Sequence, residues 1–189
     1  MPFNHFNLIA GFYDLARPFR ISKLLFELLS LSPDHRLLDA GGGTGRISTV
    51  LRSMVKGVFV ADPSFGMNHR AVDKGLPTVC AQAEFLPFSS GSFERVIMVD
   101  ALHHVIDQRQ SAYELFRVLV PGGRIVIIEP DINQFIVGFI AIFEKALLMR
   151  SHFLSGDNIA GLFTDPEAKT SLYYEGLNVI SITEKGRCL

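Results

Sequence analysis

Residues 36–45 read Arg-Leu-Leu-Asp-Ala-Gly-Gly-Gly-Thr-Gly, an apolar run that ends in a cluster of glycines. The short apolar run at 36–40 is typical of a parallel strand that is buried on both faces. Glycine allows sharp turns and a close approach of the backbone to a ligand because it carries no Cβ. Residues 46–54 follow with apolar side chains at helical spacing. We therefore predict a strand, a glycine turn and a helix.

The same alternation continues along the chain. We expect helices at residues 21–31, 46–54, 65–73 and 107–119, and strands at 36–40, 57–61, 78–81, 95–99 and 124–129. Pro121-Gly122-Gly123 is expected to form the turn before the last of these strands. Strands that alternate with helices imply right-handed crossovers and a parallel sheet. We predict an α/β fold, a Rossmann-like open and mostly parallel sheet with helices on both faces.

The last third of the chain is less regular. Residues 133–150 are expected to form a helix, 155–170 a loop or broken helix, and 178–183 a late strand. Because little chain follows 178–183, a final antiparallel strand is expected to be short or missing. Alternatively, residues 171–174 supply the partner strand, or the chain has been cut short. An uncovered sheet edge would favour a homodimer.

Length and composition fit one globular domain. The chain has 189 residues, of which 48% are hydrophobic and 20% charged, enough for a sizeable core. The net charge of -1 gives no electrostatic reason to expect a nucleic acid as partner. Two cysteines, Cys80 and Cys188, make neither a disulfide framework nor a metal pattern, so no metal is expected.

Targeting and membrane signals are weak. The first residues lack the basic start and unbroken apolar run of a signal peptide. The most apolar stretch, residues 135–149, is interrupted by Glu144 and Lys145 and is shorter than the roughly 20 residues that span a bilayer. We expect a cytoplasmic protein without stable membrane insertion.

Asp39 and the glycines after it form the pattern Asp-x-Gly-x-Gly-x-Gly, which resembles motif I of class I S-adenosylmethionine-dependent methyltransferases. NAD enzymes use a related Gly-x-Gly-x-x-Gly, but that fingerprint would require a glycine at Arg46. Further stretches resemble the methyltransferase type 11 group in the right order: 60–64, 83–88 with 92–96, 100–105 and 119–124. Residues 6–14 resemble the start of quinone-methylating relatives. The resemblance covers roughly the first two thirds of the chain.

This resemblance implies S-adenosylmethionine as the cofactor and assigns roles by motif position. Gly41, Gly43 and Gly45 would shape the turn beneath its methionine part, and Asp39 would orient the amino-acid end. Asp62 would hold the ribose hydroxyls through charge-assisted hydrogen bonds. Taken alone, Asp62 could equally cap the following helix.

The adenine side follows from the same resemblance. Pro63 and Met67 would pack on the ring, although Met67 is also an ordinary core residue. Gln82 and Ala83 would meet the adenine edge. The family usually has Asp at the position of Gln82, which offers a carbonyl oxygen without the charge.

The acceptor side offers several candidates. His103 and His104 follow the fourth strand, with His103 the candidate catalytic residue and packing its alternative role. Tyr13, as part of a lid, and His104 are both expected on the substrate side. Glu129 and Asp131 would line the substrate side or be solvated loop acids. An apolar wall or core is expected from Phe135, Phe139, Phe143, Phe153 and Phe163.

We therefore expect a single methyltransferase domain in four parts: a helical lid at 1–35, a cofactor-binding core at 36–130, a helical substrate-side insertion at 131–175 and a C-terminal strand at 176–189. Its expected function is methyl transfer to a small molecule that is hydrophobic or aromatic. The alternative is a non-catalytic protein that binds S-adenosylmethionine and keeps the fold, since fold does not fix function.

Overall fold

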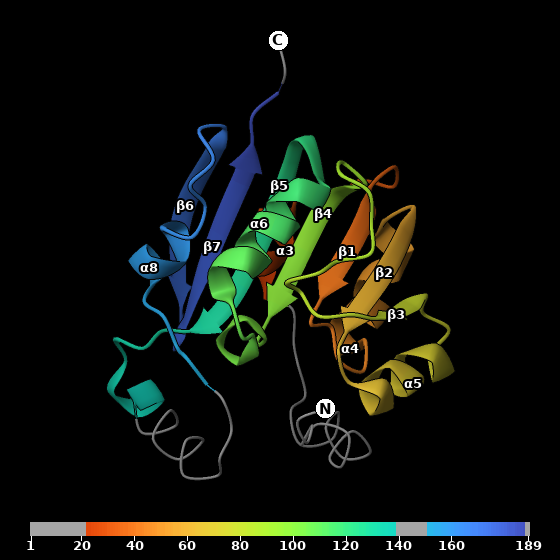
Figure 1. Ribbon diagram of the computed structural model, residues 1–189, viewed down its shortest axis with the longest axis horizontal. Coiled ribbons are helices and arrows are strands. Elements are labelled where there is room, and N and C mark those ends of the chain that lie inside the picture. Colours follow the sequence, from red (N-terminus) through yellow and green to blue (C-terminus); the bar gives the residue numbers. More distant parts are fainter. Residues whose placement is uncertain (1–21, 139–150, 188–189) are drawn as a thin grey trace.

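The computed structural model describes residues 22–138 and 151–187, which form a seven-stranded sheet with helices on both faces (Figure 1). The strand order is β3-β2-β1-β4-β5-β7-β6. The strands are β1 Arg36–Ala40, β2 Gly57–Asp62, β3 Thr78–Cys80, β4 Phe93–Val99, β5 Leu119–Pro130, β6 Ala168–Glu175 and β7 Asn178–Lys185. Strands β1 to β5 run parallel, and β7 is antiparallel to both β5 and β6. The predicted Rossmann-like fold class is confirmed.

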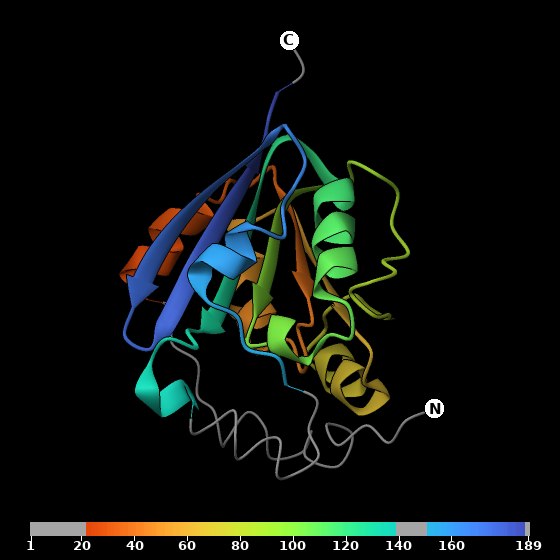
Figure 2. The same ribbon diagram turned by 60° about the vertical axis from the view of Figure 1, so that its left-hand side comes forward.

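Helices cover the two faces of this sheet. They are α3 Lys23–Leu29, α4 Arg46–Leu51, α5 Phe65–Asp73, α6 Gln108–Val118 and α8 Gly156–Ala160, with 3-10 turns η1 Arg52–Met54 and η2 Leu102–His104. Figure 2 shows α3 and α6 on opposite sides of the sheet. The side chains of α4 share a cluster with those of α3, whereas those of α8 share one with those of α6.

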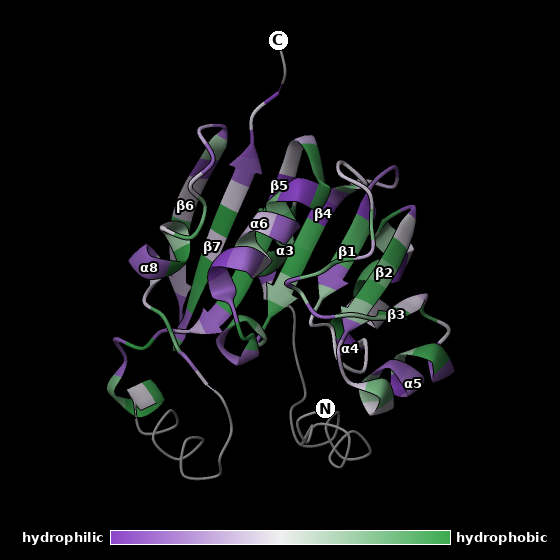
Figure 3. Cartoon of the chain, in the orientation of Figure 1, coloured by the Kyte–Doolittle hydropathy of each residue, from purple (hydrophilic) through white to green (hydrophobic). Residues whose placement is uncertain are grey.

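The core consists of two apolar layers, one on each face of the sheet. Leu37 and Leu38 are neighbours in β1 and both fully buried, yet they belong to different layers. Ile97 and Met98 divide in the same way in β4. Burial on both faces explains why the middle parts of the central strands are apolar, as the green segments in Figure 3 show.

Capping side chains fix where the helices begin. The Ser22 hydroxyl accepts from the N–H of Leu25 at 3.1 Å, and α3 starts at the next residue. Ser64 caps α5 and Asp107 caps α6 in the same manner. These polar residues lie directly before apolar helical patterns, which is why the helix positions could be predicted.

The stretch Pro121-Gly122-Gly123 does not form a separate turn, so that prediction was wrong. It lies within β5, where Gly122 has a left-handed φ of 77° and the pairing with β4 shifts between Phe93 and Arg95. The stretch is therefore an irregularity inside a long strand, of the kind that a glycine permits.

The C-terminal hairpin is complete. Strand β6 pairs with all eight residues of β7, and the hydroxyls of Thr170 and Thr183 lie 2.9 Å apart across the pair. Residues 171–174 thus supply the partner strand, which was one of the alternatives left open by the sequence. The expected helical insertion at 131–175 was wrong for residues 168–175, where β-branched and aromatic side chains favour a strand.

Several predicted features lie outside the described residues: Tyr13 with most of the expected lid, Phe139, Phe143 and Cys188. Of the predicted helix at 133–150, the described residues 135–138 are helical. Within 22–138 and 151–187, no helix has both the length and the hydropathy needed to cross a membrane.

Candidate functional site

The turn between β1 and α4 lies at the carboxyl ends of the parallel strands, at the lower edge of the sheet in Figure 1. Gly41, Gly43 and Gly45 all have left-handed backbone conformations, with φ of 69°, 56° and 70°. L side chains rarely adopt this conformation, so the backbone itself requires glycine at all three positions.

The glycines of the turn differ in what surrounds them. A Cβ on Gly41 would lie 2.5 Å from the Cβ of Ala101, and one on Gly45 would collide with the Leu76 side chain. A Cβ on Gly42 would lie 2.6 Å from the Asp39 carboxyl carbon. Among residues 22–138 and 151–187, a Cβ on Gly43 would meet only the Met67 sulfur, at 4.0 Å. Gly43 is therefore the position of this turn that faces open space within the described part of the chain.

Asp62 ends β2 beside this turn, and its side chain is 8% exposed. Oδ2 accepts from the N–H of Gly43 at 2.9 Å, and Oδ1 accepts from the N–H of Ser64 at 2.8 Å. The cap of α5 is Ser64, so Asp62 does not serve as the helix cap. Each carboxylate oxygen has two lone pairs, which leaves acceptor capacity on both oxygens.

Asp39 lies under the turn and is 1% exposed. Its Oδ2 accepts from the hydroxyl of Ser48 on α4 at 2.6 Å. Because Gly42 passes directly over the carboxylate, Asp39 supports the turn from below and braces it against α4.

Both aspartates have a pKa above the ordinary value of 3.8. Burial raises the pKa of Asp62 to about 6, while the two backbone N–H donors pull it down. Burial also raises the pKa of Asp39 to about 6, partly offset by the bond from Ser48. The charge of Asp62 raises the Asp39 pKa further, and Arg46 lowers it. Paired acids with shifted pKa values are a feature of functional sites.

Arg46 and Asp100 form an ion pair that sequence reasoning missed. The guanidinium Nη2 lies 3.4 Å from Oδ2 of Asp100, and both side chains are largely buried. The pair joins the start of α4 to the residue that follows β4. Asp100 has a φ of 51°, which is strained for a residue other than glycine. Strained backbone of this kind is concentrated at functional sites.

The buried side chain of His103 pairs with the carboxylate of Glu129. Its Nδ1 lies 2.5 Å from Oε2 of Glu129, and the side chains are 4% and 3% exposed. Oε1 of the same carboxylate accepts from the N–H groups of Ala101 and Leu102. Glu129 therefore joins the end of β5 to the turn after β4, and it is not a solvated loop acid. Asp131 is buried as well.

Aromatic and imidazole rings enclose His103. The Phe153 ring stacks on it at a centroid distance of 4.3 Å, and the His104 ring lies 3.9 Å away on a tilted plane. The His104 Nδ1 lies 3.5 Å from the Ser151 hydroxyl. The backbone N–H of His152 donates to the His103 carbonyl at 2.8 Å. Residues 151–153 thus pack against the turn after β4.

The phenylalanines of the expected wall do not gather in the described part of the chain. Phe153 stacks on His103, Phe163 packs against the core cluster near α6, and Phe135 is 80% exposed. For Phe163 the core alternative therefore holds, and the aromatic wall stays a prediction.

The expected adenine contacts lie on one side of Asp62. Met67 is 2% exposed and near Gly43, while Pro63 is exposed and its carbonyl accepts from the Cys80 thiol at 3.5 Å. Gln82 is exposed, and Ala83 is buried in the core. Of these four residues, Pro63 and Gln82 are therefore the exposed ones.

Glu84 is a further residue that the sequence did not single out for a role. It is 4% exposed, and its carboxylate accepts from the N–H groups of Ile106 and Asp107 at 2.7 and 3.2 Å. The loop after β3 is thereby joined to the start of α6. The only signal in the sequence was an acidic residue within the motif at 83–88.

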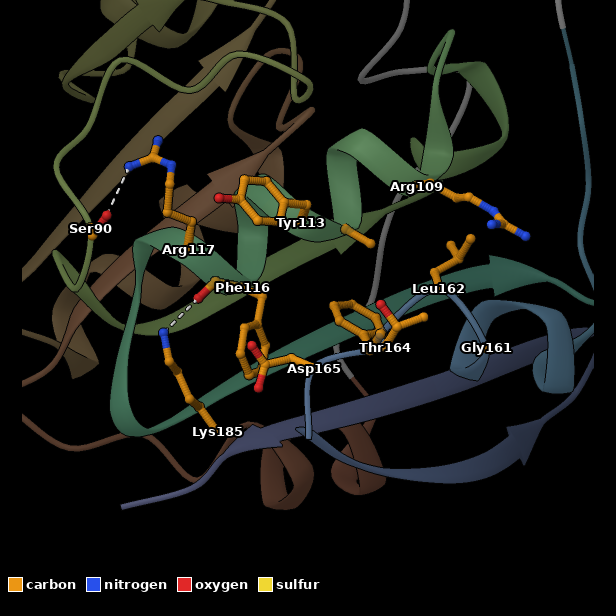
Figure 4. Close-up of a pocket in the computed structure, with 12 residues that line it drawn as sticks. Ser90, Arg109, Tyr113, Phe116, Arg117, Gly161, Leu162, Thr164, Asp165 and Lys185 are labelled. Atoms are coloured by element: carbon orange, nitrogen blue, oxygen red, sulfur yellow. Dashed lines mark hydrogen bonds between the residues drawn. The ribbon is translucent and has the colours of Figure 1, made fainter. Parts of the chain in front are cut away.

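A separate cavity of about 470 Å³ lies between α6 and residues 161–165 (Figure 4). Two of its three cations are engaged within the protein, since Lys185 donates to the carbonyls of Phe116 and Leu119 and Arg117 pairs with Glu114; the third is Arg109. None of the residues of the glycine turn lines it. In the described part of the chain, no three His, Cys, Asp or Glu side chains are grouped as metal ligands.

Comparisons with known proteins agree with this geometry. Residues 38–127 match the family model described as a methyltransferase domain. A demethylmenaquinone methyltransferase of Corynebacterium urealyticum is 31% identical over 120 residues, which cover 64% of this chain and 52% of that protein. The ubiquinone/menaquinone biosynthesis C-methyltransferase UbiE of Teredinibacter turnerae is 30% identical over 142 residues, 66% of this chain and 57% of that protein.

Solved structures share the fold. A SAM-dependent methyltransferase of Thermotoga maritima superimposes with a TM-score of 0.72 at 20% identity, covering 95% of this chain and 99% of that one. The chain spans about half the length of the curated relatives that it matches. Strand order, glycine turn and terminal Asp62 agree with these matches: residues 38–127 carry a methyltransferase domain, on the fold of solved S-adenosylmethionine-dependent methyltransferases.

Proposed function

We propose that this chain transfers a methyl group from S-adenosylmethionine to a small hydrophobic or aromatic molecule. The observation that carries the proposal is the open space over Gly43 beside a buried carboxylate, Asp62, that retains acceptor capacity. When bound, S-adenosylmethionine supplies an electrophilic methyl group on a sulfonium centre. The residues of the chain bind, orient and shield it.

The ribose and adenine contacts are proposed around Asp62. Its two oxygens each keep a lone pair, which suits the two hydroxyls of a ribose diol. Pro63 and Gln82, both exposed, would touch the adenine, with Met67 beneath and the backbone near Ala83 at the ring edge. The buried Met67 supports this surface from the core.

The methionine part is proposed to lie over the glycine turn. Gly43 leaves room for it, whereas Gly41 and Gly45 hold the turn against Ala101 and Leu76. Asp39 acts from below the turn through Ser48 and does not reach the ligand directly.

On the methyl side, we assign His103 a positioning role first. Its ring is fixed by Glu129 and Phe153, so it holds the turn after β4 in place beside the cofactor. With Nδ1 paired to a carboxylate, the imidazole is held in one orientation. His104 and Tyr13 remain predicted substrate-side residues, and residues 1–35 and 131–167 remain the predicted lid and insertion.

The names of the relatives support a quinone-type acceptor. One curated relative is named a demethylmenaquinone methyltransferase, and the other is named a ubiquinone/menaquinone biosynthesis C-methyltransferase. Alignment of acceptor and methyl group can supply up to roughly 7–11 kcal/mol of a barrier, so the chain need not provide more than position and exclusion of water. Transfer to a ring carbon of a reduced quinone is the reaction that we propose.

Two measurements test the proposal. Calorimetric titration should show micromolar binding of S-adenosylmethionine and S-adenosylhomocysteine and none of NAD. Incubation with isotopically labelled S-adenosylmethionine and reduced demethylated quinones should then label the quinone ring. Binding of NAD in preference to S-adenosylmethionine would contradict the cofactor assignment, and labelling of no phenol or quinol would contradict the reaction.

A non-catalytic S-adenosylmethionine-binding protein is the second candidate. The observation that favours it is that His103, the predicted base, is 4% exposed and engaged by Glu129. This candidate predicts tight cofactor binding without turnover on any quinol or phenol.

The remaining predictions about partners are unchanged. Absence of nucleic-acid binding, a cytoplasmic location and a homodimer remain predictions, and the strand that would carry the homodimer is β6.

A further inference from the structure

Strand β6 is an open edge of the sheet. Among the described residues it ends the strand order, and its eight residues pair with β7 on one side only. Helix α8 packs against β6 and β7 on one face, as Figure 1 shows. The opposite edge is β3, which has three residues. The longer edge offers the longer row of unpaired backbone groups for another strand.

Two opposite charges lie near the ends of β6. Lys169 and Glu175 are both exposed, and neither forms an ion pair within the described residues. Glu184 stands opposite Lys169 on β7 but pairs with Arg124 instead. Both charges are thus available to a partner.

We propose that β6 pairs antiparallel with β6 of a second copy of this chain, centred on Leu172, and so joins two sheets into one. In this register Lys169 lies opposite the partner's Glu175, and Glu175 lies opposite the partner's Lys169. Opposite charges at directly facing positions stabilise a strand pair. The two-fold symmetry makes both contacts at once.

Charge matching selects one of the neighbouring registers. Directly opposite residues of an antiparallel pair point to the same face, so a symmetric dimer can shift only in steps that keep odd residues opposite odd residues. A shift centred on Ser171 places Lys169 opposite the partner's Tyr173. A shift centred on Tyr173 places Ser171 opposite the partner's Glu175. Only the register centred on Leu172 matches the two charges.

The side chains between the charges also fit this register. Leu172 and Tyr174 face α8, because a Cβ on Gly156 would lie 3.2 Å from Leu172 and 2.8 Å from the Tyr174 hydroxyl. The odd-numbered residues therefore form the other face, where Tyr173 is 40% exposed. Tyr173 would lie beside the partner's Ser171, between the two charge pairs. The joined strands thus present one continuous row of matched side chains.

Sedimentation equilibrium on the whole chain tests the proposal. We expect the unmodified chain to dimerise, and Lys169→Glu or Glu175→Lys alone to raise the dimer dissociation constant at least about tenfold, since each places like charges opposite one another twice. The double variant Lys169→Glu with Glu175→Lys restores opposite charges in the same register, so its dissociation constant should return to within about threefold of the original. Lys56→Glu, on an exposed residue before β2, is the charge-matched control and should leave the dimer unchanged.

Circular dichroism identifies variants that do not fold, and the exposure of both side chains makes folding of all four expected. A chain that stays monomeric at every concentration overturns the proposal. A dimer that ignores both single reversals, or a double variant that remains as weak as the single ones, overturns the register. Because β6 lies at the opposite edge from Asp62, cofactor binding by these variants is expected to be unaffected.

Discussion

The carboxylate of Asp62 accepts a hydrogen bond from the backbone N–H of Gly43 at 2.9 Å. This bond joins the end of β2 to the turn that follows β1, so the proposed ribose ligand also fixes the proposed methionine cradle. Cofactor affinity and the conformation of the turn should therefore change together when either residue is altered.

Replacing Asp62 by Asn should weaken S-adenosylhomocysteine binding about 10- to 100-fold, because hydrogen bonds to a charged acceptor contribute roughly 1.5–3 kcal/mol. The amide keeps one acceptor and loses the charge. Calorimetric titration measures the change. Asp157→Asn on α8 is an exposed, charge-matched control and should bind normally. Equal affinity of the two variants would remove Asp62 from the site.

Cofactor affinity should fall as the pH drops below about 6, the raised pKa of Asp62. A protonated carboxyl is a weaker acceptor, so the dissociation constant should rise up to tenfold per pH unit between 6 and 5. Titrations at pH 5, 6 and 7.5 measure this dependence. The Asp62→Asn variant should lose most of it, and an identical profile in both proteins would assign the titration to another group.

Stability should respond to the same pKa in the opposite direction. The folded-state pKa of Asp62, about 6, is above the ordinary value of 3.8, so its contribution is fully present below pH 4. It is lost as the pH rises toward 6, at about 1.4 kcal/mol per unit, because the folded state holds the proton longer. Urea unfolding should show that the free energy of unfolding of Asp62→Asn rises relative to that of the unmodified chain as the pH increases from 4 to 6. A constant difference would argue against a raised pKa.

Gly43→Ala should abolish cofactor binding while costing only about 1–2 kcal/mol of stability for its left-handed φ. The added methyl meets only the Met67 sulfur within the protein but fills the space proposed for the ligand. Gly91→Ala is the matched control, since Gly91 has a φ of 64° with nothing within 4 Å. Both variants should unfold at similar urea concentrations, and only Gly43→Ala should fail to bind. Normal binding by Gly43→Ala would place the ligand elsewhere.

Glu129→Gln should destabilise the fold by about 1–3 kcal/mol, because a buried carboxylate with three donors becomes an amide that faces His103 with an N–H group. Turnover should fall more than cofactor affinity, and the pH profile of kcat should shift if His103 acts on the acceptor. The exposed Glu167→Gln is the control. An unchanged pH profile with lower stability would leave His103 as a packing residue.

Much of the sheet could be predicted because most of its strands are recognisable from their own residues. The apolar runs at β1, β2 and β4 and the capping residues Ser64 and Asp107 fixed those elements within a residue or two. Strand β6 was harder, since it is an edge strand with mostly exposed side chains and lacks a buried pattern. The stretch Pro121–Gly123 looked like a turn because its glycines absorb an irregularity inside β5 instead.

The candidate site divides in the same way. Gly43 and Asp62 follow from a motif with a defined spacing, and the structure brings them into contact. The pairs Arg46–Asp100 and His103–Glu129 are separated by 54 and 26 residues, and only the strand order makes them neighbours. No local pattern carries such information. The candidate residues of the acceptor side could therefore be predicted from the sequence, but their contacts with one another could not.

The position of β7 between β5 and β6 has a consequence for synthesis on the ribosome. Strand β5 is complete at Pro130, yet its second neighbour ends only at Lys185. Until those last residues have left the exit tunnel, a nascent chain would carry β5 as a bare apolar edge, with Ile125 and Ile127 ready to pair with the wrong strand. The sheet is therefore expected to be completed only after Lys185 has left the exit tunnel, and nascent chains stalled before Asn178 should be the form that chaperones hold.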